Sequence, residues 1–161
     1  MFKDEFYASD VTKITEVKLN RLQPWMERGW ITPSIQKATG HGTRNIFSLA
    51  DLLNIAFFKK AVESGLSRNA ISQLIKPFND YLLPEIKSIH EGKISFPKPY
   101  YILFFRKKEK VIGTAFERAG MSTGFIKFTK SYDADDVIGI NISNIMEEVF
   151  KKLDKKISFY F

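Results

Sequence analysis

The segment from residue 9 to residue 29 most constrains how this chain can fold, because it holds two short helices with almost no chain between them. Ser9 suits the N-cap of a helix with the sequence DVTKIT, in which two apolar residues share one face. Residues 15–17 predict a tight turn. A second helix is expected over residues 18–28, since Gly29 is a favoured residue just past a helix end. Two helices joined by about three residues predict a helix-turn-helix.

The next stretch loses the helical period and is rich in threonine, glycine and serine. Residues 34–47 predict two extended arms around a Gly-His-Gly tip centred on His41, which is the pattern of a β-hairpin. Lys37 stands on one arm and Arg44 on the other. A cationic hairpin beside two short helices predicts a wing.

Two further helices follow the predicted wing. Ser48 and Asp51 form a capping box at the start of LADLLNIAFFKKAVES, which should stop at Gly65. A helix over RNAISQLIK comes next, and Pro77 is expected to end it or bend it sharply.

The second half of the chain has a different character. Residues 77–99 contain four prolines and predict a connector with a short helix, EIKSIHEG. Two apolar runs, at 100–105 and 111–116, flank RKKEK and predict a hairpin. GFIKFTK, VIGINI and the tail KKISFYF are further strand candidates, and ISNIMEEVFKKL has the apolar stripe of an amphipathic helix.

These patterns predict an α+β protein. We expect an N-terminal winged helix-turn-helix over residues 1–76, the connector over 77–99, and a small α+β unit for dimerisation or effector binding over 100–161.

Charge and composition narrow the functions. The chain of 161 residues has a formal net charge of +7, which favours a polyanionic partner such as nucleic acid or an anionic membrane. It has no cysteine, so disulfides, thiolate zinc sites and cysteine nucleophiles are excluded. No apolar run suits a signal peptide or a membrane span. We therefore expect a soluble, cytoplasmic protein.

The N-terminal half resembles the MerR family of bacterial transcription regulators over about residues 6–76. In that family an aromatic start, a helix and a TGV turn precede a Leu-Arg-Tyr-Trp helix, a Gly-Leu-x-x-Pro step, a wing with GYR and an aromatic-Ser-x-x-Asp helix start. The matching residues here are Thr15, Val17, Leu22, Trp25, Gly29, Ile31, Pro33, Thr43, Arg44, Phe47, Ser48 and Asp51, followed by ESGLSRNAI. The resemblance implies a winged helix-turn-helix that binds DNA, and with it a nucleoid-associated protein that does not contact membranes.

The chain departs from the family pattern at four positions. Glu16 stands where the turn glycine is usual, and Ile35 where arginine is frequent. Gln23 and Pro24 replace the arginine and tyrosine that touch DNA in the family. Trp25 is interpreted as a core residue rather than a platform for stacking.

The predicted contact residues follow from the chemistry of the bases and phosphates. Arginine suits guanine, and asparagine or glutamine suits adenine, so the helix should read base edges through Asn20, Arg21 and Gln23. Phosphate contacts are expected from Lys18 and Arg28 on the helix and from Lys37 and Arg44 on the wing, with His41 as a contact at the wing tip. The alternative for each is a solvated surface residue.

Other chemistry has little support in the sequence. There is no phosphate loop, paired-histidine spacing or nucleophile elbow, so we expect neither an enzyme nor a cofactor or metal. The DADD run at 133–136 could hold a cation, but a solvated acidic loop is the preferred interpretation. Tyr100, Tyr101, Phe116 and Phe128 could surround a small effector, although an aromatic core is the simpler interpretation.

Dimerisation is assigned to the second half. Pro77 and Pro84 interrupt the place where MerR-like activators have a long dimerisation helix. We therefore expect a homodimer through residues 100–161 that binds a palindromic site in double-stranded DNA.

The predicted function is that of a sequence-specific transcription regulator. Two alternatives remain. One is an architectural DNA-binding protein of the recombination directionality or DNA-packaging type. The other is a winged-helix interaction module that does not bind DNA.

Overall fold

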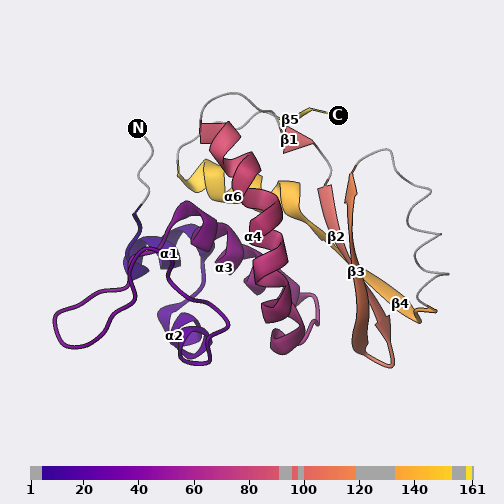
Figure 1. Ribbon diagram of the computed structural model, residues 1–161, viewed down its shortest axis with the longest axis horizontal. Coiled ribbons are helices and arrows are strands. Elements are labelled where there is room, and N and C mark those ends of the chain that lie inside the picture. The colour runs from indigo at the N-terminus through magenta and orange to yellow at the C-terminus, as the bar shows by residue number, and fades with distance from the viewer. Residues whose placement is uncertain (1–4, 91–95, 98–99, 119–132, 154–158, 161) are drawn as a thin grey trace. The chain divides into compact units, whose positions relative to one another are not determined.

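The computed structural model describes residues 5–90, 96–97, 100–118, 133–153 and 159–160. The chain divides into two compact units (Figure 1). The N-terminal unit comprises residues 1–94 and 149–156, and the C-terminal unit comprises residues 95–148 and 157–161. Helices at the N-terminus and a small antiparallel sheet later in the chain confirm the predicted α+β class.

The N-terminal unit begins with the predicted pair of short helices, α1 (Ala8–Thr15) and α2 (Leu19–Glu27). Ser9 lies inside α1, so its prediction as the N-cap is wrong. The backbone N–H of Tyr7 instead donates to the Asp10 carboxylate at 3.0 Å. Asp10 stands three residues after the cap position, where a carboxylate can satisfy a free backbone donor at the helix start.

α2 contains a proline but still reaches its predicted end. Pro24 lacks the N–H that would donate to the carbonyl of Asn20, one turn earlier. Beyond it, the N–H of Arg28 donates to the Pro24 carbonyl at 3.1 Å, and the N–H of Trp30 donates to the Trp25 carbonyl at 2.9 Å. The short helix is therefore closed at its C-terminus by the chain that turns away through Gly29.

α3 (Leu49–Glu63) starts at the predicted capping box. The N–H of Asp51 donates to Ser48 Oγ at 3.2 Å, and the N–H of Ser48 donates to Asp51 Oδ2 at 2.8 Å. The same Oδ2 also accepts from the backbone N–H and from the hydroxyl of Ser34, each at 2.8 Å. Asp51 is 5% exposed, so this one carboxylate ties the chain before α3 to the helix start.

α3 is the centre of the N-terminal core, because it is buried on almost every side. Phe57 and Phe58 are fully buried. Phe57 stacks on Phe78 with ring centroids 4.6 Å apart, and Phe58 meets Trp25 at the same distance. The helix thus contacts α4 on one side and α2 on the other.

α4 (Arg68–His90) is longer than the sequence predicted. The helix continues past Pro77 and Pro84, so the predictions that Pro77 ends it and that EIKSIHEG forms a separate helix are wrong. An interior proline costs about 3 kcal/mol. Burial of a phenylalanine side chain recovers about 2–3 kcal/mol, and Phe78, directly after the first proline, is 1% exposed. The boundaries at residues 76 and 100 stay predictions.

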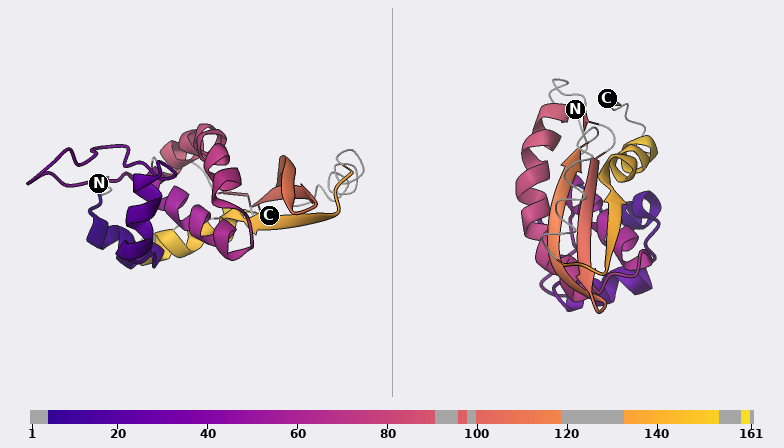
Figure 2. Two further views of the ribbon diagram at one scale, coloured as in Figure 1. Left: turned by 90° about the horizontal axis from the view of Figure 1, so that it is seen from below. Right: turned by 90° about the vertical axis from the view of Figure 1, so that its right-hand side faces the viewer.

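The C-terminal unit contains a three-stranded antiparallel sheet in the order β3-β2-β4 (Figure 2). Its strands are β2 (Tyr100–Lys107), β3 (Lys110–Arg118) and β4 (Asp136–Asn141). β2 and β3 form the hairpin predicted around RKKEK, and β4 confirms the strand predicted at VIGINI. The candidate strand GFIKFTK lies outside the described residues.

The predicted amphipathic helix follows β4 directly as α6 (Ile142–Lys152). Five residues of its predicted apolar stripe are buried, namely Ile142, Ile145, Met146, Val149 and Phe150, whereas the sixth, Leu153, is half-buried just past the helix end. β1 (Phe96–Pro97) pairs in parallel with β5 (Phe159–Tyr160), which confirms a strand in the tail.

We predict that Asp51→Ala lowers the free energy of unfolding by about 2–3 kcal/mol, because the backbone donors of Ser34 and Ser48 lose a charged acceptor. Chemical denaturation followed by circular dichroism would measure the change. Glu63→Ala, an exposed carboxylate at the other end of α3, is the matched control and should change stability by less than about 0.5 kcal/mol. Equal losses in the two variants would contradict the role given to Asp51.

Candidate nucleic-acid interface

α2 separates its buried residues from its polar ones. Leu22 and Trp25 are 0% and 3% exposed, which confirms Trp25 as a core residue. Asn20 and Gln23 are exposed, and the 100° rotation per residue of a helix puts them on the side opposite the buried pair. The predicted base-reading residues of α2 are therefore accessible to a ligand.

The charged residues of α2 flank that polar side. Lys18 occupies the N-cap position and is exposed, as are Arg21 and Arg28. The guanidinium carbon of Arg21 lies 5.7 Å from the centre of the Trp25 ring, and that of Arg28 lies 5.0 Å from the Trp30 ring. Such stacking restrains an arginine while its N–H groups stay available for a phosphate or a base.

Trp30 is itself held in place by a hydrogen bond and a ring contact. Its indole N–H donates to Asn69 Oδ1 of α4 at 3.2 Å. Its ring stacks with Phe58 at a centroid distance of 6.1 Å. The two tryptophans of this segment therefore anchor α2 to α3 and α4, and each also supports one arginine.

The turn between α1 and α2 is formed without the glycine that is usual in the family pattern. Glu16 adopts a left-handed backbone conformation with φ of 58°. The turn is closed by Thr15, whose hydroxyl donates to the Val11 carbonyl at 2.7 Å and accepts from the N–H of Val17 at 3.3 Å. The cost of a non-glycine residue here is of the order of 1 kcal/mol.

Glu16 makes two ion pairs that accompany this unusual backbone conformation. Its carboxylate accepts from Lys152 Nζ of α6 at 2.6 Å and from Lys59 Nζ of α3 at 3.4 Å. The hydrogen bond from Lys152 is the largest cause of a lowered pKa of Glu16, and Lys59 acts in the same direction. The turn that positions α2 is thus linked to α3 and to the last turn of α6, both within the N-terminal unit.

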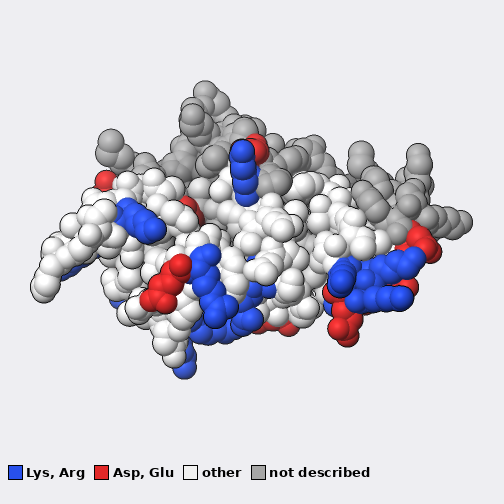
Figure 3. All heavy atoms as spheres, turned by 60° about the horizontal axis from the view of Figure 1, so that its bottom comes forward, with Lys and Arg blue, Asp and Glu red and all other residues white. Residues whose placement is uncertain are grey.

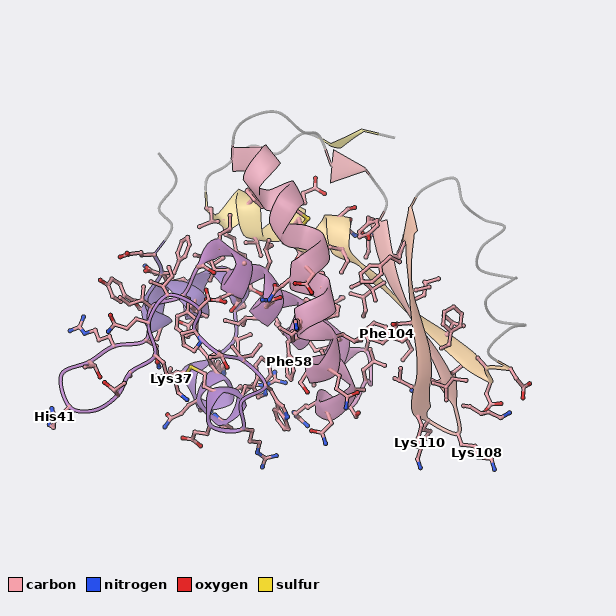
Figure 4. All side chains as sticks on the ribbon, in the orientation of Figure 1. Lys37, His41, Phe58, Phe104, Lys108 and Lys110 are labelled. Atoms are coloured by element: carbon pink, nitrogen blue, oxygen red, sulfur yellow. The ribbon has the colours of Figure 1, made fainter. Side chains whose placement is uncertain are left out.

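The loop of residues 34–47 extends away from the helices and carries exposed cations (Figures 1 and 4). Its arms pair at one antiparallel bridge, between Gln36 and Ile46, rather than along a continuous ladder. Further cross-links come from Asn45 Oδ1, which accepts from the N–H of Ala38 at 2.8 Å, and from Gln36 Nε2, which donates to the Arg44 carbonyl at 3.1 Å.

The tip of this loop is organised by one hydroxyl. Thr43 Oγ1 accepts from the N–H groups of Thr39 and Gly40 at 2.9 and 3.0 Å. It also donates to the Gly40 carbonyl at 2.7 Å. His41, labelled at the tip in Figure 4, is exposed, as are Lys37 and Arg44. The three predicted loop contacts are therefore all accessible.

A groove with a volume of about 480 Å³ separates α2 from the first arm of the loop. On the helix side it is lined by Leu19, Gln23, Met26 and Glu27. The far side is formed by Pro33, Lys37, Ala38 and Asn45, among others. The groove therefore brings one predicted base-reading residue, Gln23, and one predicted phosphate contact, Lys37, to the same hollow.

Positive charge is not spread evenly over the molecule. On the face shown in Figure 3, lysine and arginine side chains gather in two places, each with some acidic side chains beside them. In the C-terminal unit two cations at the β2–β3 turn, Arg106 and Lys107, are paired with carboxylates. Arg106 Nε donates to Asp136 at 2.7 Å, Lys107 forms an ion pair with Asp133, and the N–H of Lys108 donates to Asp135.

The three carboxylates of the DADD run at 133–136 are the acceptors in these contacts. Hydrogen bonds from Arg106 and Lys107 lower the pKa of Asp136 and of Asp133. The acidic residues thus pair with two cations of the RKKEK turn and accept one backbone hydrogen bond from it. Within the described residues, no group of three or more metal-ligating side chains is found.

Sequence reasoning assigned no contact to most residues that line the groove, among them Leu19, Glu27 and Asn45. Leu19 is 51% exposed, although its type suggested a buried position. A signal was present, because residues 19, 23 and 27 are each four apart and must share one helix face. Nothing in the sequence indicated Asn45, which reaches the groove only through the folding of the loop.

The region that holds α2 and the 34–47 loop matches a known protein family. The model for the MerR HTH family regulatory protein matches residues 7–76. The N-terminal region is therefore MerR-like. No curated protein matches the chain. The match covers α1, α2, the 34–47 loop, α3 and the first part of α4, and it confirms the resemblance seen in the sequence. A MerR-like helix-turn-helix suggests a DNA-binding transcription regulator.

The remaining predicted features have mixed outcomes. Tyr100 is buried and stacks with Phe116 at 6.3 Å, whereas Phe116 is 39% exposed. Phe128, the last member of the candidate effector site, lies outside the described residues.

In the part of the chain that the structure describes, no helix combines the length and apolar character needed to cross a membrane.

We predict that Glu16→Gln destabilises the protein at neutral pH but not in acid. A carboxylate whose pKa is lower in the folded than in the unfolded state stabilises the fold above its ordinary value of 4.5, and that contribution is lost as the pH falls through the lowered value. Thermal melts of the two proteins between pH 7 and pH 3 should therefore converge. A difference in melting temperature that stays constant with pH would contradict the ion pairs.

Proposed function

We propose that this protein is a sequence-specific, DNA-binding transcription regulator that binds a palindromic site as a homodimer. The observation that carries the proposal is the exposed polar side of α2 beside the cationic 34–47 loop, within the region that matches the MerR helix-turn-helix. A helix fits the major groove, where each base pair presents its own set of donors and acceptors.

Each group of residues has a separate task in this proposal. Asn20, Arg21 and Gln23 contact base edges from α2. Lys18 and Arg28 at the two ends of that helix contact phosphates. Lys37, His41 and Arg44 follow the sugar–phosphate backbone from the loop.

The experiment that tests this function is selection of bound sequences from a random pool of duplexes. A palindromic motif supports a dimeric regulator. Binding to all duplexes alike, with cooperative growth along the DNA, would favour an architectural protein. Absence of any duplex binding at low salt would favour the remaining alternative, a winged-helix interaction module that does not bind DNA.

We predict that Arg44→Ala weakens binding to every duplex alike and reduces the slope of log K against log salt by about 0.9, because one phosphate contact and its counterion release are lost. Fluorescence anisotropy at several salt concentrations would measure both. Lys110→Ala, an exposed cation on β3 of the C-terminal unit, is the control for net charge and should leave the slope unchanged. Equal effects of the two substitutions would contradict a local contact.

The proposed dimer interface lies within residues 100–161. Two apolar side chains of β3 support it, since Ile112 and Phe116 are 42% and 39% exposed. β3 is at one edge of the described three-stranded sheet. An edge strand with exposed apolar residues is suited to pairing with a second chain.

We predict that the double variant Ile112→Lys, Phe116→Lys is monomeric, because two charges would be buried at the interface between the two copies. Light scattering after gel filtration gives the mass directly. The substitutions should also lower affinity for the full palindrome while changing affinity for a single half-site little. A variant that keeps the mass of the wild-type protein would place the interface elsewhere.

A further inference from the structure

Three residues of α2 form a line along the helix. Leu19, Gln23 and Glu27 are spaced by four, so their side chains lie above one another on one face. All three are exposed and all three line the groove of about 480 Å³ beside the 34–47 loop. We name them the 19-23-27 stripe. The stripe presents an apolar group, an amide and a carboxylate in that order.

The amide of Gln23 is held in one orientation by its neighbour. Gln23 Nε2 donates to Glu27 Oε1 at 3.1 Å. An ionised carboxylate only accepts hydrogen bonds, so the amide nitrogen rather than the amide oxygen must face Glu27. One of the two amide hydrogens is thereby committed. Gln23 keeps one N–H donor and one carbonyl acceptor for a ligand.

That remaining set matches one purine better than the other. In the major groove adenine presents an acceptor at N7 and a donor at N6, whereas guanine presents two acceptors, N7 and O6. A free glutamine amide could donate both of its hydrogens to guanine. Once Glu27 accepts one of these hydrogens, Gln23 has one donor and one acceptor left. These match N7 and N6 of adenine, whereas one of the two acceptors of guanine would stay without a donor.

Leu19 supplies an apolar side chain that can contact a thymine methyl group. Its side chain is 51% exposed at the start of the helix, although burial of leucine is normally favourable. The C5-methyl group of thymine is the one apolar group on the base edges of the major groove, and apolar side chains contact it. A leucine one turn from an adenine-reading glutamine is therefore placed to contact a neighbouring thymine.

We propose that the 19-23-27 stripe reads an adenine and an adjacent thymine in each half-site, with Glu27 as a positioning residue that makes Gln23 selective for adenine over guanine. This inference rests on the proposed function. The alternative is a solvated surface pair that supports α2 alone, and it predicts no effect of Glu27 on base preference.

The test compares sequence selection by the wild-type protein with selection by Glu27→Ala and Glu27→Gln. Glu27→Ala frees the second amide hydrogen of Gln23, so guanine should become acceptable at the adenine position. The ratio of the affinity for adenine to that for guanine should fall, by less than the roughly 5- to 150-fold that one bidentate base contact supplies, because Gln23 can still bind adenine through both groups. Glu27→Gln removes the charge but keeps an amide oxygen that can accept from Gln23, and it should retain the preference for adenine.

The design separates hydrogen bonding from charge. Loss of a carboxylate near phosphates should raise affinity for all duplexes in both variants, and Glu63→Ala, an exposed acid on α3, controls for the change of net charge. If Glu27→Ala and Glu27→Gln keep the wild-type motif, or relax it equally, the inference is overturned while the regulator function stands. If the wild-type protein selects no motif, the proposed function itself fails.

Leu19 is tested from the DNA side. Replacing the thymine by deoxyuridine removes only the methyl group, so it should weaken binding of the wild-type protein and have no further effect on Leu19→Ala. Equal weakening of the two proteins by deoxyuridine would remove Leu19 from the inference.

Discussion

The packing of Phe58 against two tryptophans is the contact on which the arrangement of the N-terminal unit depends. Phe58 is fully buried, and its ring lies 4.6 Å from that of Trp25 and 6.1 Å from that of Trp30. α2 is too short to be stable alone and lacks one internal hydrogen bond at Pro24. Tertiary burial must therefore stabilise it, and the buried side determines which side is left for a ligand.

Electrostatics then distinguishes the two groups of cations. Arg106 and Lys107 at the β2–β3 turn are paired with the acidic run of the same sheet, whereas the exposed cations of α2 and the 34–47 loop form no ion pair within the described residues. The net charge of +7 is thus a poor guide to the site by itself. Charge also has a structural role at Glu16. Its ion pairs with Lys59 and Lys152 connect the turn of the helix-turn-helix to α3 and α6.

Local patterns were reliable where the deciding interactions are local. The capping box at Ser48 and Asp51 involves groups three residues apart, and it formed as predicted. The β2–β3 hairpin was visible as two apolar runs around a charged turn. The predicted N-cap of α1 was wrong because two adjacent residues, Ser9 and Asp10, carry suitable acceptors. The Asp10 carboxylate, rather than the Ser9 hydroxyl, accepts from the backbone N–H at the helix start.

Longer-range packing overrode local signals elsewhere. Pro77 is an ordinary helix stop in sequence terms, yet α4 continues because Phe78 is buried against Phe57, a residue about twenty positions earlier. Likewise the leucine at position 19 reads as a core residue, although the fold leaves it half exposed beside the loop. Neither outcome could be deduced from neighbours in the chain.

The sequence by itself determined the two short helices, their turn, the capped third helix and the resemblance to MerR regulators, because caps, turns and helical period depend on residues within a few positions. Only the tertiary structure decided that Asp51 also holds Ser34, and that Glu16 pairs with two distant lysines. It alone brought Lys37 and Asn45 to the groove beside the 19-23-27 stripe. Those contacts join residues far apart in the chain, and their partners are set by how the buried aromatic faces pack.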